Sequence, residues 1–462
     1  MKKNVVIIGA GLAGTLLCNE LVENCDVTLL EAGDKNGIKY PEVNFIQKRF
    51  AEVKTFCIGG GGTTNLWHNG LIPINTEDVT SEEFKKVITE TESYIDKAAC
   101  KLYWLDNPYS DEYKNIVSQM SLVAEKTGAF PDGVDCLLYP EKYRKLDVKD
   151  RVDAFYSVSN IEFVSENKRI KSVSYCSGLK KHSIDADVVI ISAGALGTPL
   201  LVKKVISAIG SSFDKIGTGL ADHPIGFIGK VKFKKHITRS MNCLSALNKG
   251  NYICRTAIRL KSKCGKYTCG AFFRPALTMG NKLSIYKYKS LIGAGNGLER
   301  VKNMFSLKIF HPDILAEIFS HLFGITIPGR IYNIIVIFEQ KRGKSRVSYD
   351  GDRLNVDWSI TKEELSIYND MLLKLNNMLT GISDEINIIT DLTEEWIWSA
   401  AHHSGTISLG NKPDDLVDKD LKLNSCDNVF VCDGSVIQEH SYANTGLTIG
   451  ALSMRLSERV LQ

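Results

Sequence analysis

Two short stretches near the end of the chain contain residues that can move a proton. The first is AHHSGTISLG, which contains His402 and His403, and the second is HSYANTGLTIG, which begins at His440 and contains Asn444. Imidazole has a pKa near neutrality, so a histidine can take a proton from a hydroxyl group while an amide orients the oxygen. Neighbouring residues of an extended segment point in opposite directions, so we expect only one of His402 and His403 to act.

A glycine-rich unit at the start of the chain predicts a dinucleotide site. The stretch NVVIIGAGLAGTLLCNELVENCDVTLLEAG contains an apolar run, three spaced glycines, a helical pattern and a second apolar run that ends at Glu31. The glycines allow a tight turn, let a pyrophosphate approach a helix N-terminus and let the helix pack on the strand. A carboxylate at the position of Glu31 accepts hydrogen bonds from ribose hydroxyls. The predicted contacts are Gly9, Ala10, Gly11, Gly14 and Glu31.

A second cluster of glycines occupies residues 59–62. Consecutive residues without side chains leave their backbone amides unobstructed, so they can form a nest that binds a pyrophosphate. The alternative is a flexible surface loop, but Cys57, Ile58 and the TTNLW segment on either side indicate burial. Gly60, Gly61, Gly62 and Thr63 are therefore candidate cofactor contacts.

The composition is that of a globular protein large enough for two domains. The chain has 462 residues, 44% hydrophobic and 24% charged. It lacks an uninterrupted apolar run of the length that spans a membrane, and we interpret its N-terminal apolar run as a strand, not a signal peptide. Its 12 cysteines include no CxxC pair, which favours reduced thiols and a cytoplasmic location, without a metal site.

Positive charge is concentrated in the middle of the chain. Between Gly226 and Lys308 there are eighteen Lys and Arg residues and one acid, Glu299, so the rest of the chain carries 4 − 17 = −13. This segregation indicates a positive field for an anionic partner, and the alternative is a basic solvated face with no partner. We do not expect nucleic acid, because no motif that reads RNA or DNA accompanies the charge.

The periodicity predicts an α/β fold in two parts. A further apolar strand lies in DADVVIISAGALGTP, residues 185–199, and an amphipathic helix is expected at 307–329. We predict a discontinuous Rossmann-like domain with an inserted, mostly antiparallel β-sheet domain. The expected strands of the insertion are 226–235, 251–261, 267–275, 331–340, 345–349 and 353–358. The predicted division is 1–75, 151–225 and 391–462 for the cofactor domain, 76–150 for a connecting helical region, and 226–390 for the substrate domain.

Taken in order, these stretches resemble the glucose–methanol–choline (GMC) family of flavoprotein oxidoreductases. The resemblance rests on GAGLAG…LLEAG, GGGGTTNLWHNG, SAGALGTP, GTGLADHP, FEQKRGKSRVSYD and the C-terminal HHSGT…NVFVCDGSVIQEHSYANTGLT, which together span nearly the whole chain. It implies FAD as cofactor. Some relatives attach the flavin to a histidine in the second glycine loop; Asn65 stands in that place here, which implies non-covalent FAD, although His68 lies three residues on.

The resemblance also implies roles for individual residues. The family's base occupies an H-x-x-G-T pattern, which begins here at His402. The partner of the base lies eleven residues after the Asp of a V-x-D-x-S segment. That Asp is Asp433 in this chain, so the implied partner is Asn444. His440 is a rival partner. Asp222 and His223 belong by resemblance to a loop that connects the two domains. Further contacts implied with FAD are Val158 for adenine, Asp433 and Gly434 for the ribityl and phosphate portion, and Thr445 for the flavin ring. Ala193 and Asn444 are also implied as cofactor contacts.

The expected reaction is therefore oxidation of a CH–OH group of an alcohol, sugar or polyol, with O2 or another external electron acceptor. The basic insertion favours a substrate with an anionic portion, such as a phosphate or nucleotide. Trp67, His403 and Trp398 are candidate substrate contacts, and core packing is the alternative for each tryptophan. Two other functions remain open: a non-redox lyase of the same family, and a flavoprotein that docks on a membrane surface or a partner.

Overall fold

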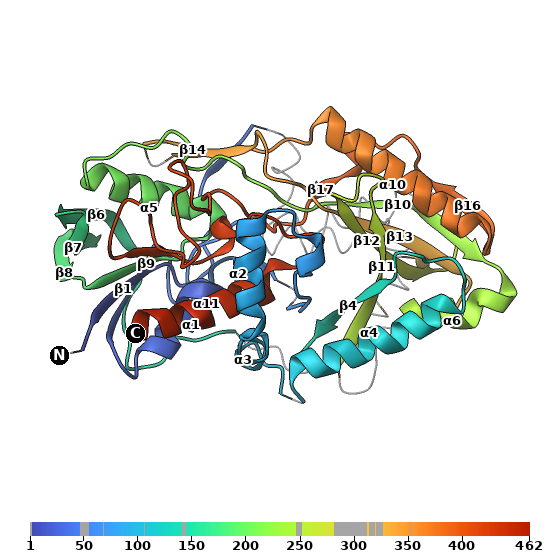
Figure 1. Ribbon diagram of the computed structural model, residues 1–462, viewed down its shortest axis with the longest axis horizontal. Coiled ribbons are helices and arrows are strands. Elements are labelled where there is room, and N and C mark those ends of the chain that lie inside the picture. Colours follow the sequence, from blue (N-terminus) through green and yellow to red (C-terminus); the bar gives the residue numbers. More distant parts are fainter. Residues whose placement is uncertain are drawn as a thin grey trace.

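The computed structural model describes residues 2–46, 55–67, 69–105, 107–140, 145–245, 252–280, 312–313, 319, 327–351 and 353–462. These residues form a mixed α/β structure. Figure 1 shows a parallel sheet at one end of the molecule and a larger antiparallel sheet at the other, with helix α11 (Thr445–Leu461) between them. The predicted helix at 307–329 and the candidate His68 lie outside the described residues, apart from 312–313, 319 and 327–329.

The parallel sheet has the strand order β18-β9-β1-β2-β5. Its strands are β1 (Asn4–Ile8), β2 (Asp26–Leu30), β5 (Asp153–Phe155), β9 (Val188–Ile191) and β18 (Val429–Val431). Helices α1 (Leu12–Leu21) and α11 pack against each other, and α5 (Gly194–Ala208) lies on the opposite side of the sheet in Figure 1. Cover on both faces explains why the strand sequences are continuously apolar. Distant segments therefore join in one sheet, which confirms the predicted discontinuous Rossmann-like fold.

The larger sheet has the order β16-β10-β13-β12-β11-β4, with β17 paired to β10, and its neighbouring strands are antiparallel. Helices α4 (Tyr109–Glu125), α6 (Thr238–Ser245) and α10 (Lys362–Thr380) pack against it. The strands predicted at 226–235, 251–261, 267–275 and 331–340 are present in it. Its strands are β4 (Val134–Tyr139), β10 (Pro224–Phe233), β11 (Ile253–Lys261), β12 (Thr268–Ala276), β13 (Ile331–Phe338), β16 (Ser383–Ile388) and β17 (Trp398–Ser399).

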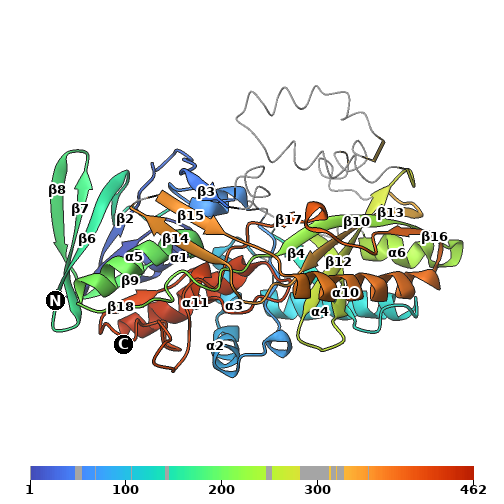
Figure 2. The same cartoon turned by 90° about the horizontal axis from the view of Figure 1, so that it is seen from above.

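Two predicted strands form but belong to a different sheet. β14 (Arg346–Asp350) and β15 (Arg353–Asp357) pair with each other, and β15 pairs in parallel with β3 (Val43–Phe45). Their assignment to the inserted sheet was wrong, because alternation of apolar residues identifies a strand and its buried face but not its partner. A further sheet of β6 (Val158–Glu166), β7 (Arg169–Ser177) and β8 (Lys180–Asp185) projects at one end of the molecule in Figure 2.

Side chains cap the start of helices α2 and α10. The Ser81 side chain accepts from the backbone N–H of Phe84 at the start of α2 (Glu82–Glu92), and Thr361 and Glu364 form a capping box at the start of α10. Helix α3 (Ile95–Lys101) lies between α2 and α4 in sequence. Among the described helices, none combines the length and apolarity needed to cross a membrane.

Candidate active site

The first glycine loop shows close packing at two glycines and open space at the third. A Cβ atom on Gly14 would overlap the carbonyl oxygen of Gly9, and a Cβ on Gly9 would overlap the carbonyl oxygen of Ser192. Gly11, the N-cap residue of α1, has no atom within 4 Å of its would-be Cβ. The open side of the loop therefore faces the N-terminus of α1, where an anionic pyrophosphate is stabilised by free backbone N–H groups.

Glu31 joins the two glycine loops. Its carboxylate accepts backbone hydrogen bonds from Ala10 at 2.7 Å, Gly33 at 2.8 Å and Gly59 at 2.9 Å. Burial raises the pKa of Glu31, and these three N–H donors act in the opposite direction. Besides its predicted place at a ribose, Glu31 thus has a structural role, because it connects residues that are 28 positions apart in the chain.

The second glycine loop packs on the first. The N–H of Gly61 donates to the carbonyl of Ala10 at 2.8 Å, and a Cβ on Gly62 would lie 3.1 Å from the Cα of Gly11. The Asn65 amide donates to the carbonyls of Gly60 at 3.1 Å and Gly62 at 2.8 Å. Asn65 therefore holds the loop in shape. Thr63 lies beside it in the short 3-10 helix η2 (Gly62–Leu66).

Asp433 binds a third loop to the same edge of the parallel sheet. Its carboxylate accepts from Gly194 N at 2.8 Å, from Thr198 Oγ1 at 2.5 Å and from Ser435 N at 2.7 Å. Ala193, one residue earlier, is the N-cap of α5. Burial raises the pKa of Asp433, and its hydrogen bonds act in the opposite direction because they stabilise the ionised carboxylate.

Val158 and Gly434 complete the predicted cofactor contacts. The Val158 N–H donates to the carbonyl of Glu31 at 3.0 Å, so a contact with adenine would use its carbonyl or side chain. A Cβ on Gly434 would lie 2.8 Å from the carbonyl oxygen of His403, which brings this loop directly against the histidine segment. Any side chain at residue 434 would displace that segment.

The residues at this edge fit a dinucleotide. Ser192 Oγ is buried and has no hydrogen-bond partner among the described residues. This hydroxyl follows the end of β9 in the parallel sheet, at the edge where doubly wound sheets bind ligands. Together with the open face of Gly11, it provides a donor and space that the protein itself does not use.

A strand pairing that the sequence did not predict brings His223 to His402. Pro224 of β10 pairs with Ser399 of β17, and the pairing continues as a bridge between Ala221 and Ser404. His223 lies between these two contacts, and its carbonyl accepts from Ala400 N at 3.0 Å. The sequence interpretation treated Asp222 and His223 as a connecting loop; the structure places both within the histidine cluster.

The two imidazoles meet edge to edge. His223 Nδ1 lies 2.7 Å from His402 Nδ1, and His223 Nε2 lies 2.9 Å from the carbonyl oxygen of Ser441. A carbonyl can only accept, so His223 carries its proton on Nε2 and, when neutral, presents a lone pair at Nδ1. His402 must then donate from Nδ1, which leaves the lone pair of His402 on Nε2.

Asp222 contacts His402 and His403, the two adjacent histidines named here the HH pair, and also the backbone of His223. Its buried carboxylate accepts from the backbone N–H of His223 at 2.7 Å and of His402 at 2.9 Å, and from the Ser399 hydroxyl. His403 Nε2 lies 3.5 Å from Asp222 Oδ2. Burial lowers the pKa of His402 and of His403, and the charge of Asp222 opposes that effect. Neutral imidazoles are therefore the resting forms near neutral pH.

Two residues next to the contact between His223 and His402 have a left-handed backbone conformation. Ala401 has φ = 62° and Ser441 has φ = 53°, a region that residues with a Cβ rarely occupy. Each such residue costs on the order of 1 kcal/mol or more and persists where its surroundings fix it. Here these two residues precede His402 and supply the carbonyl that binds His223.

The remaining candidates lie around this cluster. Asn444 is the N-cap residue of α11, its side chain does not cap the helix, and Thr445 is the first helical residue. A Cβ on Gly446 would overlap the Trp67 indole, so that ring packs on the first turn of α11. The Trp398 ring lies 6.1 Å from the ring of Phe227. His440 is buried against His223, with 4.0 Å between ring centroids.

Comparison with known proteins agrees with this geometry. Residues 349–453, which include the HH pair, Asp433 and Asn444, match the family model described as GMC oxidoreductase. The C-terminal part of the chain is therefore similar to the GMC oxidoreductases. This match agrees with the resemblance stated from the sequence, which implies FAD as the cofactor.

Several solved structures share the fold of this chain at low identity. A pyridoxine 4-oxidase from Mesorbium loti is 14% identical, with a TM-score of 0.58 and 99% of both chains covered. An FAD-dependent oxidoreductase from Chaetomium thermophilum is 13% identical, with a TM-score of 0.60 and 99% of both chains covered. A formate oxidase from Aspergillus oryzae is 15% identical, with a TM-score of 0.60, covering 99% of this chain and 98% of the other. The search of curated proteins returned no match.

Proposed function

We propose that this protein is an FAD-dependent oxidoreductase of the GMC type that oxidises a CH–OH group of a small alcohol, sugar or polyol, with His402 as the base. The observation that carries the proposal is the contact of His402 Nδ1 with His223 Nδ1, which places the lone pair of His402 on Nε2. That atom takes the hydroxyl proton of the substrate. The chemistry that bound FAD would supply is an acceptor for the hydride of the carbon that bears the hydroxyl.

The other residues of the cluster prepare this proton transfer. His223 fixes the tautomer of His402, and Asp222 holds the backbone at both histidines. Because burial lowers the pKa of His402, its imidazole is neutral and able to accept a proton at neutral pH. Asn444, whose side chain does not cap its own helix, donates an amide N–H to the substrate oxygen.

FAD is held by the loops that surround the open face of Gly11. We assign the pyrophosphate to Gly9–Gly14 and the second glycine loop, the ribose to Glu31, and the ribityl chain to Ala193, Asp433 and Gly434. Asn65 occupies the place of a flavin-linking histidine and is hydrogen-bonded to its own loop, which supports non-covalent FAD. Trp67, His403 and Trp398 are retained as substrate contacts.

One observation each supports the electron acceptor and the substrate class. Two of the similar structures are named as oxidases, which supports O2 as an acceptor. The basic segment 226–308 supports an anionic portion on the substrate. The division into a cofactor domain, a connecting region and a substrate domain, and the cytoplasmic location, stay predictions from the sequence.

Anaerobic mixing of the purified protein with a panel of substrates tests the reaction. The panel contains simple alcohols, sugars, polyols, sugar phosphates and nucleotide sugars, and the absorbance of the flavin is followed. We expect one class to bleach the flavin. Absence of bleaching with every class, in a protein that contains FAD, would reject CH–OH oxidation and favour the non-redox lyase. Acid precipitation should release the flavin into the supernatant, because it is not covalently bound.

A further inference from the structure

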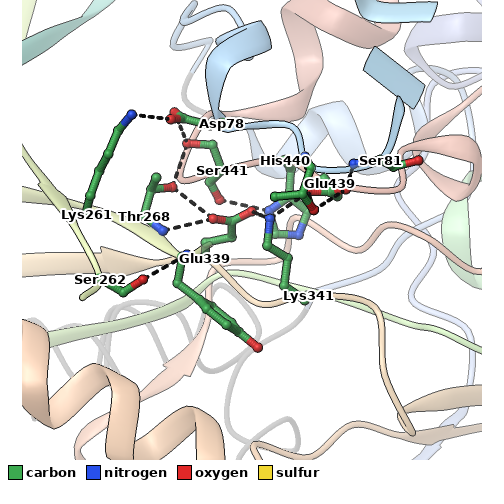
Figure 3. A network of polar contacts seen from close by, with 12 residues as sticks. Asp78, Ser81, Lys261, Ser262, Thr268, Glu339, Lys341, Glu439, His440 and Ser441 are labelled. Carbon is green, nitrogen blue, oxygen red and sulfur yellow. Dashed lines mark hydrogen bonds and ion pairs between the residues drawn. The ribbon is translucent and has the colours of Figure 1, made fainter. Parts of the chain in front are cut away.

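Two carboxylates, those of Glu439 and Asp135, hold the loop of residues 439–442 to the rest of the molecule. Glu439 accepts from the backbone N–H of Thr80 at 2.9 Å and of Ser81 at 2.7 Å. The Tyr442 hydroxyl donates to Asp135. These contacts fasten the loop to residues outside the parallel sheet, and Figure 3 shows the one between Glu439 and Ser81.

Within this loop, Ser441 contacts two other parts of the molecule. One is the larger antiparallel sheet, here named the substrate sheet, and the other is the histidine cluster of His223, His402, His403 and His440. Its hydroxyl donates to Asp78 Oδ2 at 3.1 Å and lies 2.9 Å from Thr268 Oγ1. Its carbonyl oxygen accepts from His223 Nε2 at 2.9 Å. One residue therefore connects a strand of the substrate sheet with the proton that sets the histidine tautomers.

Thr268, the first residue of β12, is itself fixed from two directions. Glu339 Oε2 accepts from Thr268 N at 2.9 Å and lies 3.0 Å from Thr268 Oγ1. Lys341 Nζ lies 2.6 Å from Glu339 Oε1 and 2.7 Å from Glu439 Oε2, so one ammonium group links the sheet to the loop. Figure 3 shows this run of contacts from Lys341 through Glu339 and Thr268 to Ser441.

On the far side, Asp78 is held by two cations. Arg259 of β11 forms an ion pair with it, and Lys261 lies at 3.7 Å. Asp78, Thr268, Glu339 and Ser441 are each less than a tenth exposed. In such surroundings hydrogen bonds hold polar groups in one arrangement, since an unpaired buried group is costly.

We propose that Thr268 and Ser441 are positioning residues of the reaction. Their hydroxyl contact aims the Ser441 carbonyl at His223 Nε2 and so keeps the lone pair of His402 on Nε2. The inference rests on the proposed role of His402, but the arrangement of protons that it predicts exists without substrate. It also means that a strand of the substrate sheet controls the base.

The physical basis is the unusual backbone of Ser441. At φ = 53° the residue is not in a preferred conformation, so its peptide group needs fixed partners to keep its direction. Loss of the hydroxyl contact lets the carbonyl turn away from His223. His223 can then carry its proton on Nδ1 and donate to His402, which moves the lone pair of His402 to Nδ1, away from the substrate.

The experiment compares Thr268→Val, which removes only the hydroxyl, with Thr268→Ser, which restores it. Thr91→Val is the matched control, because Thr91 is equally buried and its hydroxyl binds Val87 O of its own helix at 2.6 Å. The tautomer of each histidine is read by nitrogen NMR of protein labelled with ¹⁵N-histidine and containing FAD. The rate of flavin reduction and the substrate dissociation constant are measured on the same proteins.

We expect Thr268→Val to give a mixture of His402 tautomers and to slow flavin reduction on the order of tenfold, with FAD content and substrate affinity unchanged. Thr268→Ser and Thr91→Val should behave as the native protein. An unchanged His402 tautomer in Thr268→Val would overturn the inference, even if no substrate reduced the flavin. If Thr268→Val does not fold, Ser441→Gly, which suits a positive φ, must show the same mixture for the inference to stand.

Discussion

His402 Nδ1 and His223 Nδ1 lie 2.7 Å apart, although the two residues are 179 positions apart in the chain. Two like atoms can share only one proton, so one imidazole must donate and the other accept. The Ser441 carbonyl, which binds His223 Nε2, decides which one does. The resulting lone pair at His402 Nε2 is the centre of the proposed mechanism.

Replacing His223 tests this relationship. His223→Phe keeps a planar ring of similar size but removes the acceptor for His402 Nδ1. The fraction of His402 with its lone pair on Nε2 should fall, and flavin reduction should slow on the order of ten- to a hundredfold. Stopped-flow reduction measures the rate. A variant that only lost thermal stability, with an unchanged rate per bound flavin, would make His223 a packing residue.

The buried histidines predict a loss of stability in acid. Burial lowers the pKa of His440 from 6.5 to about 4, so the unfolded chain binds more protons than the native protein in this range. The contribution of neutral His440 to the free energy of unfolding is therefore complete above about pH 6.5 and is lost as the pH falls towards 4. For His440 it amounts to roughly 3 kcal/mol.

Urea unfolding at several pH values measures this effect. Between pH 6.5 and 4.5 the free energy of unfolding should fall less steeply for His440→Phe than for the native chain, because one titrating group is missing. Equal slopes for the two proteins would show that His440 does not titrate in this range.

Two glycines three positions apart should respond to alanine in different ways. Gly11→Ala adds a methyl group where no protein atom lies within 4 Å, so the thermal stability of the apoprotein should stay the same while FAD affinity falls at least about tenfold. Gly14→Ala overlaps the Gly9 carbonyl and should lower stability by roughly 1–3 kcal/mol. Calorimetry and flavin titration separate the two. Normal FAD affinity in Gly11→Ala would contradict the assignment of the pyrophosphate to this position.

Those parts of the candidate site that are contiguous in the chain could be proposed from the sequence. The glycine loops, Glu31 and the spacing that led to His402 and Asn444 all lie in short stretches whose residue types carry the signal. Asn65 was assigned by its place in a loop, and only the structure shows that it binds that loop's own carbonyls.

Contacts that depend on strand pairing could not be predicted in this way. His223 reaches His402 because β10 pairs with β17, and nothing in the ADHP stretch states that partner. The same limit explains why β14 and β15 were assigned to the wrong sheet. The available signal was the position of Asp222 and His223, a neighbouring acid and imidazole immediately before a strand.

The most direct test of the central claim is anaerobic flavin reduction in His402→Ala. The account predicts full FAD content, a rate at least a hundredfold below the native rate, and partial recovery when imidazole is added, because the missing group is a base. His236→Ala, at an exposed surface position, should keep the native rate. A native rate in His402→Ala with bound FAD would contradict the assignment of His402 as the base.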